Sequence, residues 1–285
     1  MALTLGSAGA TATATIDESD GGRLTSLLID GVETIGGAPP APGAPKGWYH
    51  GVFPMAPYAG RVRNAEFTFE GRPVRLTPNN GPHAGHGLVF DRPWTVVRHN
   101  TSRLSLRIEL DDRWPWGGTV EQTFALEPDR LEISLTIRNE QRRMPATLGL
   151  HPWFARHTQA GNASFTFLPA RRFSTDAEGF PGPAGTDLGQ RPWDDVFTDL
   201  MADPVVSWPG GPSIHLSSSA SIWTVFEQLD EGFCIEPLTA PPDSIGTMST
   251  AVVGPGQPLT LRFWLAWAEP ATDPRPPPRL SYGTT

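Results

Sequence analysis

The sequence has one cysteine, no cluster of basic residues and no long apolar run. A single cysteine, Cys234, excludes an internal disulfide and a cysteine zinc cluster. With 22 basic against 30 acidic residues, the net charge of −8 argues against a nucleic-acid partner. No stretch approaches the ~18 apolar residues of a membrane span, and residues 1–22 lack the basic and apolar regions of a secretory signal. We therefore expect a cytoplasmic protein that binds no membrane.

Turn-forming residues are abundant instead, with 30 glycines and 31 prolines in 285 residues. Between them, apolar and polar residues alternate with period two, which is typical of half-buried strands. Three such segments, 104–110, 131–137 and 259–267, carry Leu, Ile, Phe or Trp at every second position. No helical periodicity of comparable length is present. Many short strands at close spacing predict an all-β fold, a large antiparallel sandwich or barrel.

The remaining segments predict a hairpin, two loops and a tail. Residues 67–76 form the expected hairpin, with a turn at Glu70–Gly71. Residues 36–47 and 179–195 are rich in Pro and Gly, which predicts loops. About 270–285 is expected to be a flexible tail. With no internal repeat and no break in composition, we expect residues 1–285 to form a single domain, either a monomer or a homodimer.

Aromatic residues and histidines give weaker signals when each is taken alone. Most of the ten tryptophans are expected in the core, with one or two lining a pocket. His83 and His86 lie among glycines, where a turn can present a side chain, but no further ligands complete a zinc signature, so no metal is predicted. Cys234 lies in the apolar run GFCIEP, which favours a buried strand cysteine over a nucleophile.

Two polar residues follow apolar strands and precede proline. His151 lies in LGLHPWF and Glu236 in FCIEPLTAPPD. Because proline favours an extended or turn geometry in the residue before it, each side chain is expected at a strand end. A buried glutamate is costly unless it is hydrogen-bonded or functional.

Four motifs, in this order along the chain, resemble those of the aldose 1-epimerase (galactose mutarotase) family. They are PYAGRVRNAEFTFEGRPVRLTPNNGPHAGHG, LGLHPWF, WDDVF and CIEPLTAPPD, between about residues 55 and 245. The resemblance implies a galactose mutarotase-like supersandwich and an isomerase that needs no cofactor. It implies His151 as general acid and Glu236 as general base, with Arg61, His86 and Asp194 binding sugar hydroxyls.

The chain departs from the family pattern at two places. Gly60 precedes the arginine where the family usually has Asn, so one sugar contact is expected to be missing. HGLVFDRPW lacks the usual doubled glycine after its histidine, which implies a difference in specificity. The aspartate motif leaves Asp194 and Asp195 both open, with the spacing to Phe197 favouring Asp194.

Opening a cyclic hemiacetal removes the proton of the anomeric hydroxyl and adds one to the ring oxygen. A carboxylate and a protonated imidazole suit these tasks, and modest tuning of their pKa values near neutrality is expected to suffice. The leading hypothesis is mutarotation of a free hexose. The alternatives are a hexose 6-phosphate epimerase using Arg61 and Arg63 or Arg171 and Arg172, a non-catalytic sugar-binding protein, and a glycoside-processing enzyme with paired carboxylates.

Overall fold

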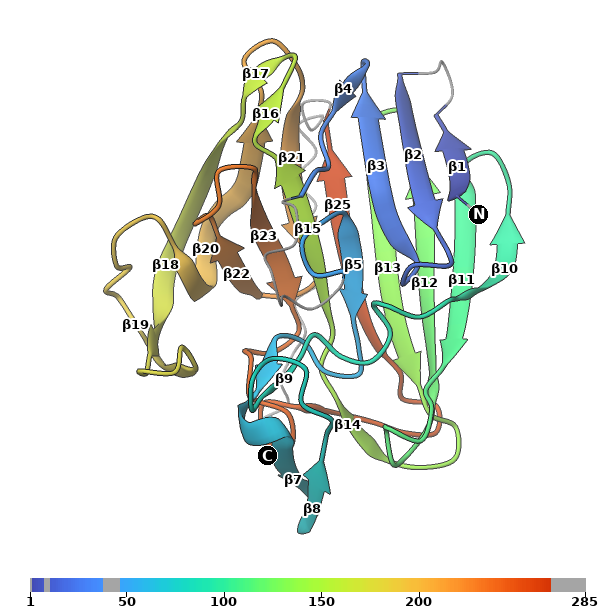
Figure 1. The fold of residues 1–285 in the computed structure, drawn as a ribbon, viewed down its shortest axis with the longest axis vertical. Coiled ribbons are helices and arrows are strands. Elements are labelled where there is room, and N and C mark those ends of the chain that lie inside the picture. The colour runs from blue at the N-terminus through green and yellow to red at the C-terminus, as the bar shows by residue number, and fades with distance from the viewer. Residues whose placement is uncertain (1, 8–10, 38–46, 268–285) are drawn as a thin grey trace.

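The computed structural model describes residues 2–7, 11–37 and 47–267 (Figure 1). Within these ranges the regular structure is β, apart from a single 3₁₀ turn, η1 (Arg63–Ala65). All pairings between the strands of these ranges are antiparallel, and the strands stack in two layers (Figure 1). The predicted all-β antiparallel sandwich is confirmed. None of the described residues forms a helix long and apolar enough to cross a membrane.

The first layer contains the strands that carry the candidate site. In order of pairing they are β1 (Ala2–Gly6), β2 (Ala12–Asp17), β3 (Arg23–Ile29), β5 (Val52–Met55), β15 (Gly149–Ala155), β23 (Gly232–Leu238) and β22 (Ile222–Phe226), with β4 (Val32–Glu33) beside β3.

The second layer runs behind β1, β2 and β3 in Figure 1. It consists of β10 (Thr95–His99), β11 (Arg103–Glu109), β12 (Thr119–Leu126), β13 (Arg130–Arg138), β25 (Leu259–Ala266) and β21 (Ser213–Ser218). The long strand β20 (Asp194–Ser207) joins the layers, because its first residues pair with β22 and its last with β21. Strand β18 (Ser164–Thr175) runs along β20, and β19 (Pro181–Gly185) pairs with β18.

Four small pairs of strands complete the fold. They are β6 (Arg61–Val62) with β9 (Ala84–Gly85), β7 (Glu66–Phe69) with β8 (Arg72–Arg75), β14 (Met144–Ala146) with β24 (Ala251–Val253), and β16 (His157–Thr158) with β17 (Gly161–Asn162).

The core lies between the two layers and follows the period-two pattern. Strands β11, β13 and β25 occupy the three segments predicted from alternation, and their apolar positions are buried in one cluster with residues of β2, β3 and β15. Each such side chain removed from water contributes roughly 1.5–3 kcal/mol. Strands β15 and β23 differ because both of their faces are buried. Leu150 and Phe154 join the core, whereas Trp153 packs on the opposite face under the loops.

The hairpin prediction is confirmed and one loop prediction is wrong. Strands β7 and β8 meet at Glu70 (φ 48°) and Gly71 (φ 74°), the two positive φ angles that a tight hairpin turn requires. Residues 179–195, predicted as a loop, contain β19 and the start of β20. Proline is tolerated there because β19 is an edge strand, which leaves a missing N–H unpaired without breaking a ladder.

Several predictions fall on parts of the chain outside the described residues. They include most of the predicted loop at 36–47 and the predicted tail at 270–285. That residues 1–285 form one domain stays a prediction.

A substitution at Gly87 measures how tightly the turn after His86 is packed against the end of β5. It has φ +80°, and a Cβ atom there would lie 2.2 Å from the Ala56 carbonyl oxygen, which accepts the Leu88 N–H at 2.7 Å. Gly71 has φ +74° with nothing within 4 Å of the same position. We expect Gly71→Ala to lower the free energy of unfolding by about 1 kcal/mol through backbone strain alone.

Gly87→Ala is expected to cost at least about 2 kcal/mol more than Gly71→Ala, because the turn must move away from β5. Chemical denaturation of both variants measures the difference. Equal losses would contradict the tight packing of this turn.

Candidate functional site

A pocket of about 250 Å³ opens on the face of the first layer that lies away from the core. It is the place where the five residues singled out in the sequence come together, since its lining includes His151, Glu236, Arg61, His86 and Asp194. Small-molecule sites commonly span ~300–1,000 Å³, so this pocket has room for one small polar molecule.

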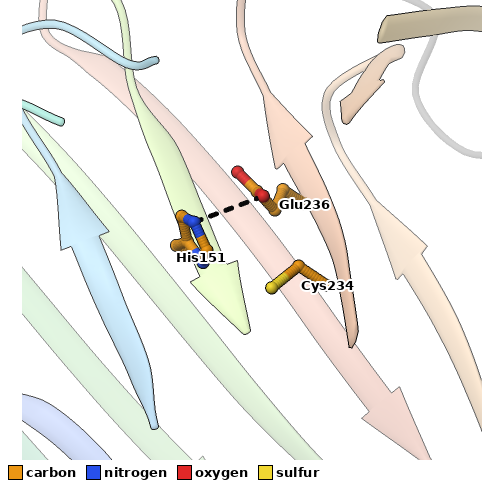
Figure 2. Close-up of side chains that lie close together, drawn as sticks. All are labelled: His151, Cys234 and Glu236. Carbon is orange, nitrogen blue, oxygen red and sulfur yellow. Dashed lines mark ion pairs between the residues drawn. The ribbon is translucent and has the colours of Figure 1, made fainter. Parts of the chain in front are cut away.

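The register of β15 and β23 places His151 and Glu236 directly opposite each other. Gly149 pairs with Leu238, and Trp153 with Cys234. The ladder is interrupted between these pairs, where His151 faces Glu236. Nε2 of His151 lies 3.4 Å from Oε1 of Glu236 (Figure 2).

Two prolines account for the interruption. The Thr239 N–H donates to Leu148 O (2.8 Å), and hydrogen-bonded pairs alternate along an antiparallel ladder. The nitrogens of Pro237 and Pro152 therefore fall at positions whose N–H would bridge the two strands, and neither has one. The expectation that each proline stops its strand is wrong, because both lie inside strands that continue beyond them.

His151 is held by stacking rather than by hydrogen bonds. Its ring stacks on the Phe53 ring, with centroids 4.4 Å apart and planes at 20°. The Arg23 guanidinium lies over the Phe53 ring, 4.9 Å from its centroid. Arg23 is fully buried and bound to Asp20, His50 O and Phe90 O. Nδ1 of His151 has no hydrogen-bond partner among the described residues.

Burial shifts both members of the pair toward their neutral forms. It raises the pKa of Glu236 well above its usual range, and nearby Asp194 adds to the shift. It lowers the pKa of His151 well below its usual range, with His86 and Arg23 acting in the same direction. Both directions are opposite to the expected modest tuning toward a charged imidazole and a charged carboxylate.

Arg61 reaches the pocket from β6 with its guanidinium already ordered. It donates to the backbone carbonyls of Glu178 (3.2 Å) and Gly179 (2.5 Å) and lies 4.8 Å from the Phe180 ring centroid. It has no ion pair with the described residues, and Glu66 pairs with Arg75 instead. Its charge therefore remains available to a ligand.

The neighbouring Gly60 has a structural reason to be glycine. Its φ is +67°, and a Cβ atom would lie 2.7 Å from Cγ of Pro242. An asparagine does not fit this backbone without displacing the proline, so the departure from the family pattern is built into the local packing.

His86 lies at the inner wall, on a backbone with φ +59°. Its ring meets Trp48 edge-on at 4.2 Å and His151 at 5.1 Å between centroids, and Nδ1 lies 3.0 Å from the sulfur of Met55. Burial, together with the positive charge of Arg61, lowers the pKa of His86 to about 3. The imidazole is therefore neutral at physiological pH.

Of the two aspartates left open, Asp194 lines the pocket, whereas Asp195 binds Arg172 at 3.0 Å. Partial removal from water raises the pKa of Asp194, while Arg61 opposes the shift. Asp194 keeps part of its surface in water, unlike the buried His151 and Glu236.

The sequence missed several residues that the fold brings to the site. The pocket walls include Trp48, Tyr49, Trp153 and Phe226, so two of the ten tryptophans line a pocket as expected. Thr224 pairs with Glu236 across β22 and β23, and its buried hydroxyl has no partner among the described residues. Only the register of these strands identifies it.

With this geometry in view, comparisons with known proteins place the chain in a family. A family model described as aldose 1-epimerase matches residues 2–195. The uncharacterized protein YphB of Escherichia coli K12 is 32% identical over 198 residues, 67% of this chain and 62% of YphB. The aldose 1-epimerase of the same organism is 28% identical over 163 residues, 51% of this chain and 46% of the enzyme. The matches thus span less than two thirds of these relatives.

The fold agrees with a solved structure of a galactose mutarotase-like protein from Lactobacillus casei. Its TM-score is 0.75 at 18% identity, with 94% of this chain and 100% of the other covered. The architecture is therefore that of the galactose mutarotase-like β-sandwiches. The chain belongs to the aldose 1-epimerase family.

The raised pKa of Glu236 predicts a pH-dependent effect of Glu236→Gln on stability. Between the unfolded pKa, near 4.5, and the raised folded value, the folded protein binds more protons than the unfolded chain. The contribution of Glu236 protonation to the stability of the wild-type protein is thus fully present below pH 4.5, and it is lost as pH rises through this window. The amide of the variant has no charge to bury. The free energy of unfolding of Glu236→Gln relative to wild type is therefore expected to increase by about 1–2 kcal/mol from pH 4.5 to pH 8.

Denaturant unfolding at several pH values measures this gain, with the exposed Glu66→Gln as control. A difference between Glu236→Gln and wild type that stays constant with pH would contradict the burial of an unsupported carboxylate.

Proposed function

We propose that this chain is a cofactor-independent aldose 1-epimerase that interconverts the anomers of a free aldohexose. The observation that carries the proposal is the contact of His151 and Glu236, 3.4 Å apart, in a pocket with room for one sugar. Membership of the family supports the reaction class.

In the proposed reaction, Glu236 takes the proton of the anomeric hydroxyl as the bond between C1 and the ring oxygen breaks. The bonding electrons go to the ring oxygen, which takes a proton from His151, and C1 becomes an aldehyde carbon. Rotation about the C1–C2 bond presents the other face of the carbonyl. On closure, His151 takes back the proton of the attacking hydroxyl and Glu236 gives its proton to the anomeric oxygen, so the pair ends as it began.

The pair needs one proton between its two members. Burial of both groups favours the neutral arrangement, with the proton on Glu236 and an unprotonated His151. Transfer of this proton across their contact gives the carboxylate and imidazolium that ring opening requires, without exchange with solvent. A sugar hydroxyl against the pair would hydrogen-bond to both charged groups and stabilise them.

Arg61, His86 and Asp194 are proposed to bind the other hydroxyls. The Arg61 guanidinium is held by backbone carbonyls, so little side-chain freedom is lost when its remaining N–H groups donate to a sugar. Neutral His86 keeps Nε2 for a sugar hydroxyl, since its Nδ1 lies 3.0 Å from the sulfur of Met55. Trp48 and Trp153 supply apolar faces for the C–H groups of the ring.

A free sugar fits the charges better than a 6-phosphate does. Among the described residues, Arg61 is the one arginine in the pocket lining. Arg63 binds Asp176 and Glu178, Arg172 binds Asp195, and Arg171 donates to the Ala184 carbonyl. A dianionic phosphate requires more uncommitted donors than this arrangement offers.

The test measures anomer exchange of a panel of aldohexoses and their 6-phosphates by polarimetry and exchange NMR. We expect the wild-type protein to accelerate exchange of at least one free hexose, and to act less on its phosphate. Glu236→Gln should exchange anomers at least about 10³-fold more slowly, because the amide cannot take a proton. Its sugar affinity should stay within about tenfold of wild type, which corresponds to ~1.4 kcal/mol.

Asp195→Asn is the matched control, since Asp195 neighbours a pocket residue but does not line the pocket. Exchange at the background rate for all sugars, with tight binding of one, would instead support a sugar-binding protein. Full activity of Glu236→Gln would place the base elsewhere.

A further inference from the structure

A third side chain lies against the pair, on the protein side of the pocket. Cys234 precedes Glu236 by two residues on β23, so both project from the same face, and it pairs with Trp153 of β15. Its thiol is fully buried. The nearest ligand atoms of His151, Cys234 and Glu236 all lie within 4.8 Å of one another, and Figure 2 shows the three side chains converging.

These three ligand atoms have few other hydrogen-bond partners among the described residues. No hydrogen-bond donor among the described residues reaches the Glu236 carboxylate apart from its contact with His151, although Glu236 is only 4% exposed. The proposed reaction assigns Cys234 no task. A buried carboxylate without donors is unusual, and it is costly until something positively charged or hydrogen-bonding meets it.

The separation of His151 and Glu236 suits two ligands of one tetrahedral cation. With metal–nitrogen and metal–oxygen bonds of about 2.0–2.1 Å and tetrahedral angles, two ligand atoms stand roughly 3.3–3.4 Å apart. The separation of His151 Nε2 and Glu236 Oε1 is 3.4 Å. A sulfur ligand binds at about 2.3 Å, so it belongs slightly farther from the other two.

We propose that His151, Cys234 and Glu236 form a binding site for a thiophilic divalent cation such as Zn²⁺. One sulfur, one nitrogen and one oxygen match its preferences. The fourth position faces the pocket, where water completes the shell. The cation replaces the thiol proton and the proton shared by the pair, and both leave to solvent.

An occupied site blocks the proposed epimerase, because the metal holds the lone pairs that would accept and return protons. This inhibitory part rests on the proposed function, whereas the binding part does not. Zn²⁺ is thus an inhibitor of this chain rather than its cofactor.

The experiment titrates the chelator-treated, dialysed protein with Co²⁺, a coloured substitute for Zn²⁺. The wild type is expected to bind one equivalent with a near-ultraviolet thiolate-to-cobalt band and the visible bands of tetrahedral Co²⁺, and Zn²⁺ should bleach both. Cys234→Ala should lose the thiolate band and bind at least about tenfold more weakly. Glu236→Gln should keep the thiolate band with similarly weakened affinity, which gives a second variant that does not alter the buried thiol.

Anomer exchange provides the functional arm. In the presence of chelator, Cys234→Ala should match wild type, and stoichiometric Zn²⁺ should inhibit wild type but not this variant. Absence of a thiolate band in wild type, or equal affinity in wild type and both variants, overturns the site. Because the Co²⁺ titration does not require activity, failure of the proposed epimerase reaction is distinguished from failure of the metal site.

Discussion

The interrupted ladder between β15 and β23 is the constraint on which the candidate site depends. Pro152 and Pro237 remove one N–H donor each from adjacent strands, on either side of the contact between His151 and Glu236, so the ladder between β15 and β23 is interrupted there. Intact pairs on both sides of the gap keep the strands in register. The opposed side chains are thereby positioned by a sheet rather than by loops, and rigid elements hold reacting groups more precisely.

The surrounding residues fix the pair at an energetic cost. Phe53 stacks on His151, and Arg23 behind it ties together the turn at Asp20 and the segments at His50 and Phe90. None of these contacts neutralises Glu236. The protein thus keeps a buried acid and a buried base without supporting hydrogen bonds, an arrangement that lowers stability and leaves both groups ready to meet a polar ligand.

Much of this arrangement is predictable from local sequence. Alternating apolar residues predicted β11, β13 and β25, and Glu70–Gly71 predicted the hairpin, because both signals depend on neighbouring residues alone. The motifs also identified five residues that line one pocket. The position of Cys234 against His151 was not predictable, since it depends on the pairing of two strands about 80 residues apart in the chain.

Pro152 and Pro237 do not end their strands, although the sequence suggests that they do. Both prolines lack an N–H that would bridge β15 and β23, yet the two strands continue because β15 also pairs with β5 and β23 also pairs with β22. The sequence alone does not show these neighbouring strands. The ionisation of the pair is not predictable from the sequence either, because reference pKa values do not include burial.

The central claim is that His151 and Glu236 act as one unit with a shared proton. A double-mutant cycle on the anomer-exchange rate, with His151→Gln, Glu236→Gln and the double variant, tests it most directly. We expect the double variant to be no more than about tenfold slower than the slower single variant, because either substitution already disables the pair. Losses that multiply in the double variant would show that His151 and Glu236 act as two independent groups.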